Sequence, residues 1–146
     1  MNNESCIHRQ NILKDRFFKL PNEEAKYDMI IQMGKKIAPM DPLYLQPENL
    51  VAGCQSQMFL VASEKEGKVF FQVASDALIS AGLAALMLEV YNGETAETIL
   101  TCPPVFIDEL GIATSLTPSR ANGLYSVHLR MKQEALKLII KRQKQS

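Results

Sequence analysis

The sequence predicts an α+β fold in which helices precede and follow a small antiparallel β-hairpin. Two apolar runs, residues 57–62 and 69–74, are rich in residues that favour strands. The charged, glycine-containing segment 64–68 lies between them and is typical of a hairpin turn. On both sides of this hairpin, apolar residues recur at the three- and four-residue spacing of helices.

Two helices are predicted before the hairpin. Apolar residues at helical spacing mark the first over about residues 7–20. Pro21 interrupts this pattern, and Asn22 is a favourable N-cap for a second helix that ends before Pro39. Residues 40–52 contain two prolines, so we expect an irregular loop there.

The segment that follows the hairpin predicts the central helix of the fold. It runs from about Ala77 to Tyr91 and is apolar on nearly every side, which indicates burial. We expect Ser75 or Asp76 to cap its start, and Asn92-Gly93 to end it.

Three more helices are predicted in the last third of the chain. Thr95 is expected to cap a short helix, and Pro103-Pro104 precedes another that ends at Gly111. Thr117 is an expected N-cap for a long last helix, Pro118–Lys141, with proline at its first position. We expect this helix and the central one to pack on the same face of the hairpin.

Length and composition favour one globular domain. The chain has 146 residues, 47% of them apolar, which is enough to form a core without metal or disulfides. We therefore expect residues 1–146 to form a single domain, with loosely ordered tails at 1–9 and 142–146. Three cysteines without a C-x-x-C pair argue against a disulfide framework and favour a reducing compartment.

The net charge of the chain indicates which kinds of partner it binds. Lys plus Arg and Asp plus Glu are both 16, so the chain lacks the basic excess that nucleic-acid binding needs. The polar start and the absence of a long apolar stretch predict no secretory signal and no membrane span, hence a cytoplasmic location.

The charges are unevenly distributed along the chain. Residues 69–119 hold six acidic and no basic side chains, whereas residues 120–146 hold seven basic side chains and one acidic side chain. This segregation indicates either a basic helix packed beside acidic neighbours or a polarised docking surface.

Most familiar catalytic patterns are absent from the sequence. Cys6 and His8 are the only close pair of possible zinc ligands, and His128 lies far away on the last helix, so we expect no metal site. The scattered glycines form no phosphate-binding loop. Because His128 stands at a helical position whose neighbours we expect to be mostly solvated, we expect it on the surface rather than in a hydrolase triad.

Cys54 is the candidate reactive residue. Gly53 before it permits a tight turn, while Gln55 and Ser56 supply donors that can stabilise a sulfur anion. Cys102 follows apolar residues and is expected to be packed, and Cys6 lies on the expected N-terminal tail with no supporting residues. From residue types alone, a buried structural role for Cys54 stays open.

The segment 53–57, Gly-Cys-Gln-Ser-Gln, followed by an apolar strand, resembles the signature of the SufE family of sulfur-acceptor proteins, which partner cysteine desulfurases. Further stretches at 23–34, 75–83 and 116–124 resemble other parts of that family in the same order. The resemblance covers about residues 10–135.

This resemblance implies a SufE/IscU-like fold and a sulfur acceptor, Cys54, that takes up sulfur as a persulfide. It implies that Asp76 and Arg120 lie near the loop or the partner surface, and we expect Gly53, Gln55 and Ser56 likewise to support the loop or contact the partner. Pyridoxal phosphate is expected on the partner desulfurase and no cofactor on this chain. An iron–sulfur scaffold is the expected recipient of the sulfur, and a homodimer is possible.

Two residues depart from the family pattern. Ser115 stands where a histidine is common, so proton transfer at that place is in question. Phe59 replaces a common tryptophan and is expected to pack in the same way. Two other classes of function stay open: a peroxide-reactive thiol protein, which would need a resolving cysteine, and an iron–sulfur scaffold, which would need several converging ligands.

Overall fold

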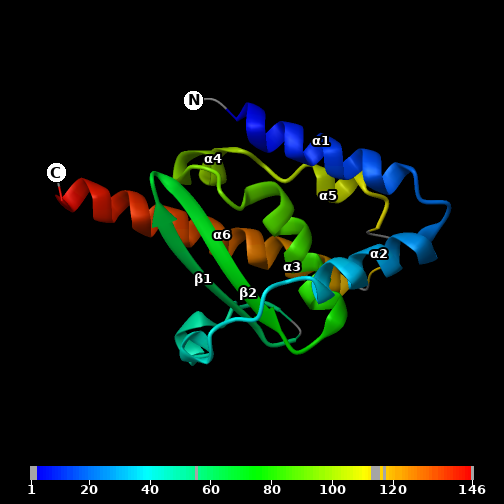
Figure 1. The fold of residues 1–146 in the computed structure, drawn as a ribbon, viewed down its shortest axis with the longest axis horizontal. Coiled ribbons are helices and arrows are strands. Elements are labelled where there is room, and N and C mark those ends of the chain that lie inside the picture. Colours follow the sequence, from blue (N-terminus) through cyan, green and yellow to red (C-terminus); the bar gives the residue numbers. More distant parts are fainter. Residues whose placement is uncertain (1–2, 55, 113–115, 117, 146) are drawn as a thin grey trace.

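The computed structural model describes residues 3–54, 56–112, 116 and 118–145, and it has the predicted α+β architecture (Figure 1). In chain order the elements are α1 (Glu4–Phe18), α2 (Glu23–Lys35), the 3-10 turns η1 (Pro42–Tyr44) and η2 (Pro47–Asn49), β1 (Met58–Lys65), β2 (Lys68–Ser75), α3 (Leu78–Tyr91), α4 (Ala96–Thr101), α5 (Phe106–Glu109) and α6 (Pro118–Gln145). No helix within these ranges is long and apolar enough to cross a membrane.

The hairpin is antiparallel, as predicted, and longer than expected. Its register runs from Met58 opposite Ser75 to Lys65 opposite Lys68. The connection is therefore the two residues Glu66 and Gly67, whose φ angles of 55° and 79° are typical of a type I′ turn. This turn matches the twist of the flanking strands and lets them extend beyond the two apolar runs.

One face of the hairpin is buried. The inward residues alternate along both strands and comprise Met58, Leu60, Val69, Phe71 and Val73. Helix α3 packs against β2, and α6 packs against β1, so the predicted packing of both helices on the hairpin is confirmed. In Figure 1 the hairpin lies across α6, with α3 beside it.

Helix α3 is buried on most of its circumference, as its composition predicts. The prediction that Ser75 or Asp76 caps it is wrong, because Ala77 is the N-cap and no side chain fills that role. The Ser75 hydroxyl instead accepts a hydrogen bond from the Ala77 amide at 3.3 Å, which turns the chain between β2 and α3. The predicted caps Asn22 and Thr95 do accept hydrogen bonds from the first turns of α2 and α4.

Helices α2 and α3 meet at their backbones. A Cβ atom added at Gly82 would lie 2.2 Å from the Ile30 carbonyl oxygen, and one at Gly34 would lie 2.6 Å from the Gly82 nitrogen. Neither position has room for a side chain. Glycine at both sites is thus what lets α2 lie against α3.

The N-terminal segment is not a loose tail. Residues 4–9 form the first turns of α1, and Cys6 is completely buried. The buried face of α1 consists of Cys6, Gln10, Leu13 and Phe17, whereas Ile7, Ile12 and Phe18 are exposed. The helix begins earlier than predicted because a cysteine and a glutamine lie on its buried face, and hydrophobic spacing does not mark these residue types. Residues 142–145 likewise continue α6 as helix.

The expectation that His128 lies on the surface is also wrong. Its side chain is 7% exposed, and its ring stacks on Tyr91 with centroids 5.1 Å apart. Burial lowers its pKa to about 4, with a smaller contribution from nearby Lys132, so the imidazole is neutral at physiological pH. The polar neighbours in sequence lie on the outer side of α6, whereas His128 points into the core.

An ion pair joins the basic last helix to the acidic segment before it. Arg142 near the end of α6 donates to Glu97 of α4 at 2.7 Å. This contact agrees with the first of the two interpretations, a basic helix packed beside acidic neighbours.

We predict that Gly82→Ala destabilises the fold by about 2 kcal/mol, because the new methyl group forces α2 away from α3. Urea unfolding followed by circular dichroism measures this change. The matched control is Gly123→Ala in α6, where a Cβ meets nothing within 4 Å. The control is expected to gain about 0.5–1 kcal/mol from helix propensity. Equal stability of the two variants would contradict the close contact.

Candidate functional site

The Cys54 segment is a loop closed at its base by β-type pairing. The Val51 amide donates to the Met58 carbonyl at 2.8 Å, and Leu50 forms an isolated bridge with Phe59. On the upstream side, Arg130 of α6 donates to the Leu50 carbonyl at 2.7 Å. Both ends of the loop are therefore fixed to the sheet and to α6.

Gly53 places the loop against α6. Its φ of 85° lies in the left-handed region, which a residue with a side chain adopts only at a cost. A Cβ atom there would lie 2.6 Å from the Ser126 hydroxyl oxygen. The backbone conformation favours glycine immediately before Cys54, and a side chain there would displace the Ser126 hydroxyl.

Ser56, on the other side of Cys54, joins a hydrogen-bonded cluster with Ser80 and Arg120. The Arg120 guanidinium donates to the Ser56 hydroxyl at 3.0 Å and also to the Ser80 hydroxyl, while Ser80 donates to Ser56 at 3.1 Å. Ser80 lies in the first turn of α3, and Arg120 lies in the first turn of α6. The cluster fixes the loop to the start of both helices.

A small cavity of about 20 Å³ lies beside the loop. Its walls come from the loop, β1, α3 and α6, and the lining residues are Cys54, Met58, Ser80, Leu83, Arg120, Gly123 and Val127. A space of this size holds about one water-sized atom. Cys54 thus lies beside a mostly apolar cavity whose charged lining residue is Arg120.

The protonation of Cys54 follows from this setting. The residue is half-buried, and desolvation raises the pKa of its thiol above the ordinary value of 9.0. At neutral pH the thiol is therefore protonated. The Arg120 guanidinium lines the same cavity as Cys54.

The structure brings together four of the predicted site residues: Gly53, Cys54, Ser56 and Arg120. Asp76 is exposed and does not line the cavity, but it directly follows Ser75, the partner of Met58, and so lies at the same end of the hairpin. Gln55, Ser115 and Thr117 lie outside the described residues.

Ser80 and Ser126 were missed by the sequence analysis. Ser80 is a hydroxyl in the otherwise apolar first half of α3, a pattern that marks it in the sequence. Ser126 has no such signal, because α6 is amphipathic and carries polar residues along its whole length.

The other two cysteines lie elsewhere. Cys6 and Cys102 are both buried, and neither lines the cavity beside Cys54. Among the described residues, no group of three or more His, Cys, Asp or Glu side chains could hold a metal ion.

These observations define a small α+β protein with one partly accessible cysteine on a loop fixed by an arginine. Residues 11–135 match the family described as SufE, Fe–S metabolism associated domain. The chain belongs to the SufE family, and its role lies in iron–sulfur metabolism.

Individual relatives agree with this assignment. An uncharacterized SufE-like protein of Synechocystis is 38% identical over 84% of this chain and 77% of its own length. SufE-like protein 1, chloroplastic/mitochondrial, of Arabidopsis thaliana is 36% identical over 94% of this chain, which spans only 37% of that longer protein. The solution structure of a hypothetical protein from Thermus thermophilus has a TM-score of 0.76 at 26% identity and covers 90% of this chain and 96% of its own.

We predict that Gly53→Ala destabilises the protein by about 2 kcal/mol, from the left-handed backbone and the contact with Ser126 together. Gly67→Ala is the matched control, since Gly67 has a φ of 79° with nothing within 4 Å of its added Cβ. Urea unfolding is expected to show a larger loss for Gly53→Ala, and Ser126→Ala is expected to restore part of it. No difference between the two glycine variants would contradict the proposed contact.

Proposed function

We propose that this protein accepts sulfur from a cysteine desulfurase on Cys54, as a persulfide, and passes it on for iron–sulfur cluster assembly. The observation that carries the proposal is the position of Cys54, which lies on a loop fixed by Arg120 and Ser56 beside a cavity of atomic size. Membership of the SufE family supports it.

The transfer is a thiol exchange in which the electrons balance. The Cys54 thiolate attacks the terminal sulfur of the persulfide on the desulfurase cysteine. A new sulfur–sulfur bond forms on Cys54, and the bond in the donor persulfide breaks, which leaves the donor cysteine as a thiolate. The proton of Cys54 passes to a base, and no external oxidant is needed.

The chain itself does little to activate the thiol. Burial raises the pKa of Cys54, so the thiolate forms when the loop meets a partner that accepts the proton. Arg120 acts as a positioning residue through Ser56, and its charge at the cavity edge stabilises the sulfur anion. Asp76, which is exposed at the same end of the hairpin, is proposed to face the partner.

The partners follow from this chemistry. Pyridoxal phosphate belongs to the desulfurase, and an iron–sulfur scaffold takes the sulfur next. We propose a cytoplasmic location, in a reducing compartment that keeps Cys54 available as a thiol. A homodimer stays compatible with the proposal.

The two other classes of function receive no support from the site. A peroxide-reactive thiol protein would place a resolving cysteine near Cys54, yet Cys6 and Cys102 are buried outside its cavity. An iron–sulfur scaffold would need ligands converging on Cys54, and no such group lies among the described residues.

We predict that Cys54→Ser folds normally but no longer takes up sulfur, because serine keeps the shape and lacks the nucleophilic thiolate. The measurement is mass spectrometry after incubation with a desulfurase and cysteine. The wild-type protein is expected to gain the mass of one sulfur atom, mapped to the tryptic peptide 37–65, which contains Cys54 and no other cysteine. Sulfur on Cys6 or Cys102 at the wild-type level in the variant would refute the assignment.

We predict that Arg120→Ala weakens desulfurase binding by about 2 kcal/mol, or roughly 30-fold in Kd. The variant lacks the hydrogen bond that fixes the loop at Ser56, and the interface with the partner lacks the positive charge of Arg120. Titration calorimetry measures this affinity. Lys137→Ala is the control, since Lys137 lies farther along α6 and pairs with Glu134. Equal affinity of Arg120→Ala and the control would remove Arg120 from the site.

A further inference from the structure

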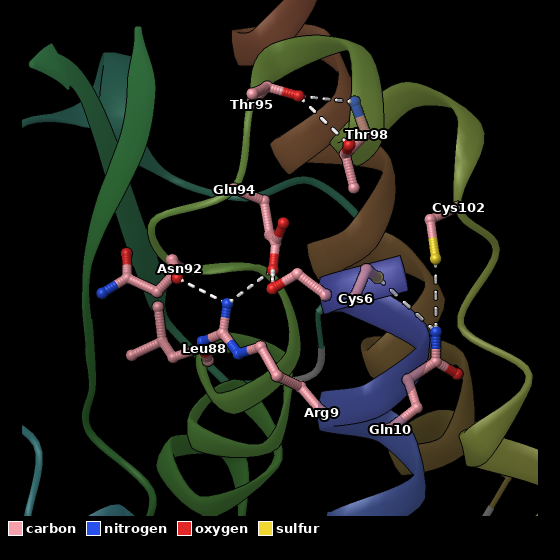
Figure 2. Close-up of polar contacts among 10 residues, drawn as sticks. Cys6, Arg9, Gln10, Leu88, Asn92, Glu94, Thr95, Thr98 and Cys102 are labelled. Atoms are coloured by element: carbon pink, nitrogen blue, oxygen red, sulfur yellow. Dashed lines mark hydrogen bonds and ion pairs between the residues drawn. The ribbon is translucent and has the colours of Figure 1, made fainter. Parts of the chain in front are cut away.

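Two buried cysteines meet in a part of the fold that the proposed function does not use. Cys6 belongs to α1, and Cys102 is the C-cap of α4. The Gln10 side-chain amide donates to both sulfur atoms, at 3.6 Å to Cys6 and 3.5 Å to Cys102 (Figure 2). Because one amide nitrogen lies within 3.6 Å of both sulfur atoms, the two thiols are close in space, although the residues are far apart in the sequence.

Both sides of this pair are held in place. Gln10 donates to the Pro103 carbonyl at 3.1 Å and accepts from the Phe106 amide at 3.1 Å, so it ties α1 to the segment between α4 and α5. On the other side, the Tyr91 hydroxyl donates to the Cys102 carbonyl at 2.7 Å. These bonds fix the backbone of Cys102 and the Gln10 amide that lies next to both thiols.

A surface cavity adjoins one of the two cysteines, Cys102. It has a volume of about 340 Å³ and is lined by Cys102 and Gln10 together with Asn3, Ile7, Lys14 and Pro103. A cavity of this size admits a small molecule. Cys6 does not line it and is completely buried, so a reagent in the cavity meets Cys102 first.

We propose that Cys6 and Cys102 form a modification site, a dithiol that low-molecular-weight disulfides oxidise to an intramolecular disulfide joining α1 to the end of α4. The Cys102 thiolate attacks the small disulfide R–S–S–R, and the first RS⁻ leaves. Cys6 then attacks the sulfur of Cys102 in this mixed disulfide, and the second RS⁻ leaves. The two cysteines lose two electrons, the small disulfide gains them, and the cysteine protons end on two RSH molecules.

The environment favours the oxidised state once it forms. Burial, and then the hydrogen bond with Cys102, raise the pKa of Cys6 to about 12, so the site disfavours a thiolate. A disulfide is uncharged, and its reduction must regenerate a thiolate in this buried place. The bond also closes a long loop, from residue 6 to residue 102, which restricts the unfolded chain.

The test uses the full chain with Cys54→Ser, so that the exposed thiol does not react, and cystamine as the small disulfide. Trypsin places Cys6 in peptide 1–9 and Cys102 in peptide 69–120. We expect the intact protein to lose the mass of two hydrogen atoms and the two peptides to be joined. The midpoint of thermal unfolding is expected to rise by about 10 °C in the oxidised form.

Single variants in the same background test the order of the two steps. Cys6→Ser is expected to accumulate one cysteamine on Cys102, whereas Cys102→Ser is expected to remain unmodified. Circular dichroism checks that each variant is folded, and Cys→Ala versions replace any that is not. Unmodified thiols, cysteamine retained on both cysteines, a disulfide between two chains, or a lowered unfolding midpoint would each overturn the proposal. None of these results depends on whether Cys54 accepts sulfur.

Discussion

The backbone contact between α2 and α3 is the constraint on which the rest of the structure depends. Because Gly34 and Gly82 leave no room for side chains, α3 lies deep enough to contact α1, α2, α6 and β2. Its first turn then places Ser80 beside the Cys54 loop, and Leu83 lines the adjoining cavity. The position of the reactive loop thus follows from packing at a distance from it.

Features that depend on neighbours in sequence could be predicted. The hairpin, the caps Asn22 and Thr95, and the burial of α3 follow from local patterns of apolar, turn-forming and capping residues. The position of Cys54 on a loop follows in the same way from Gly53 and the strand after it. The family resemblance, which spans most of the chain, is confirmed by the match over residues 11–135.

Features that depend on contacts between distant segments could not be predicted from the sequence. Ser80 and Arg120 meet across α3 and α6, and no local pattern marks that contact. Cys6 and His128 were misplaced for a related reason, since each lies among polar residues in sequence and becomes buried only when α1 and α6 dock. Hydrophobic periodicity identifies the helices well but identifies their buried faces poorly when cysteine, glutamine or histidine occupies them.

The cavity beside Cys54 has a consequence for the amount of sulfur that one chain carries. Its volume of about 20 Å³ leaves space for about one atom next to the thiol. Under the proposed function, a single added sulfur fills this space and is shielded from water on the side of Met58, Leu83 and Val127. A longer polysulfide would exceed the volume of this cavity. Under the proposed function, the cavity therefore suits the transfer of one sulfur atom at a time.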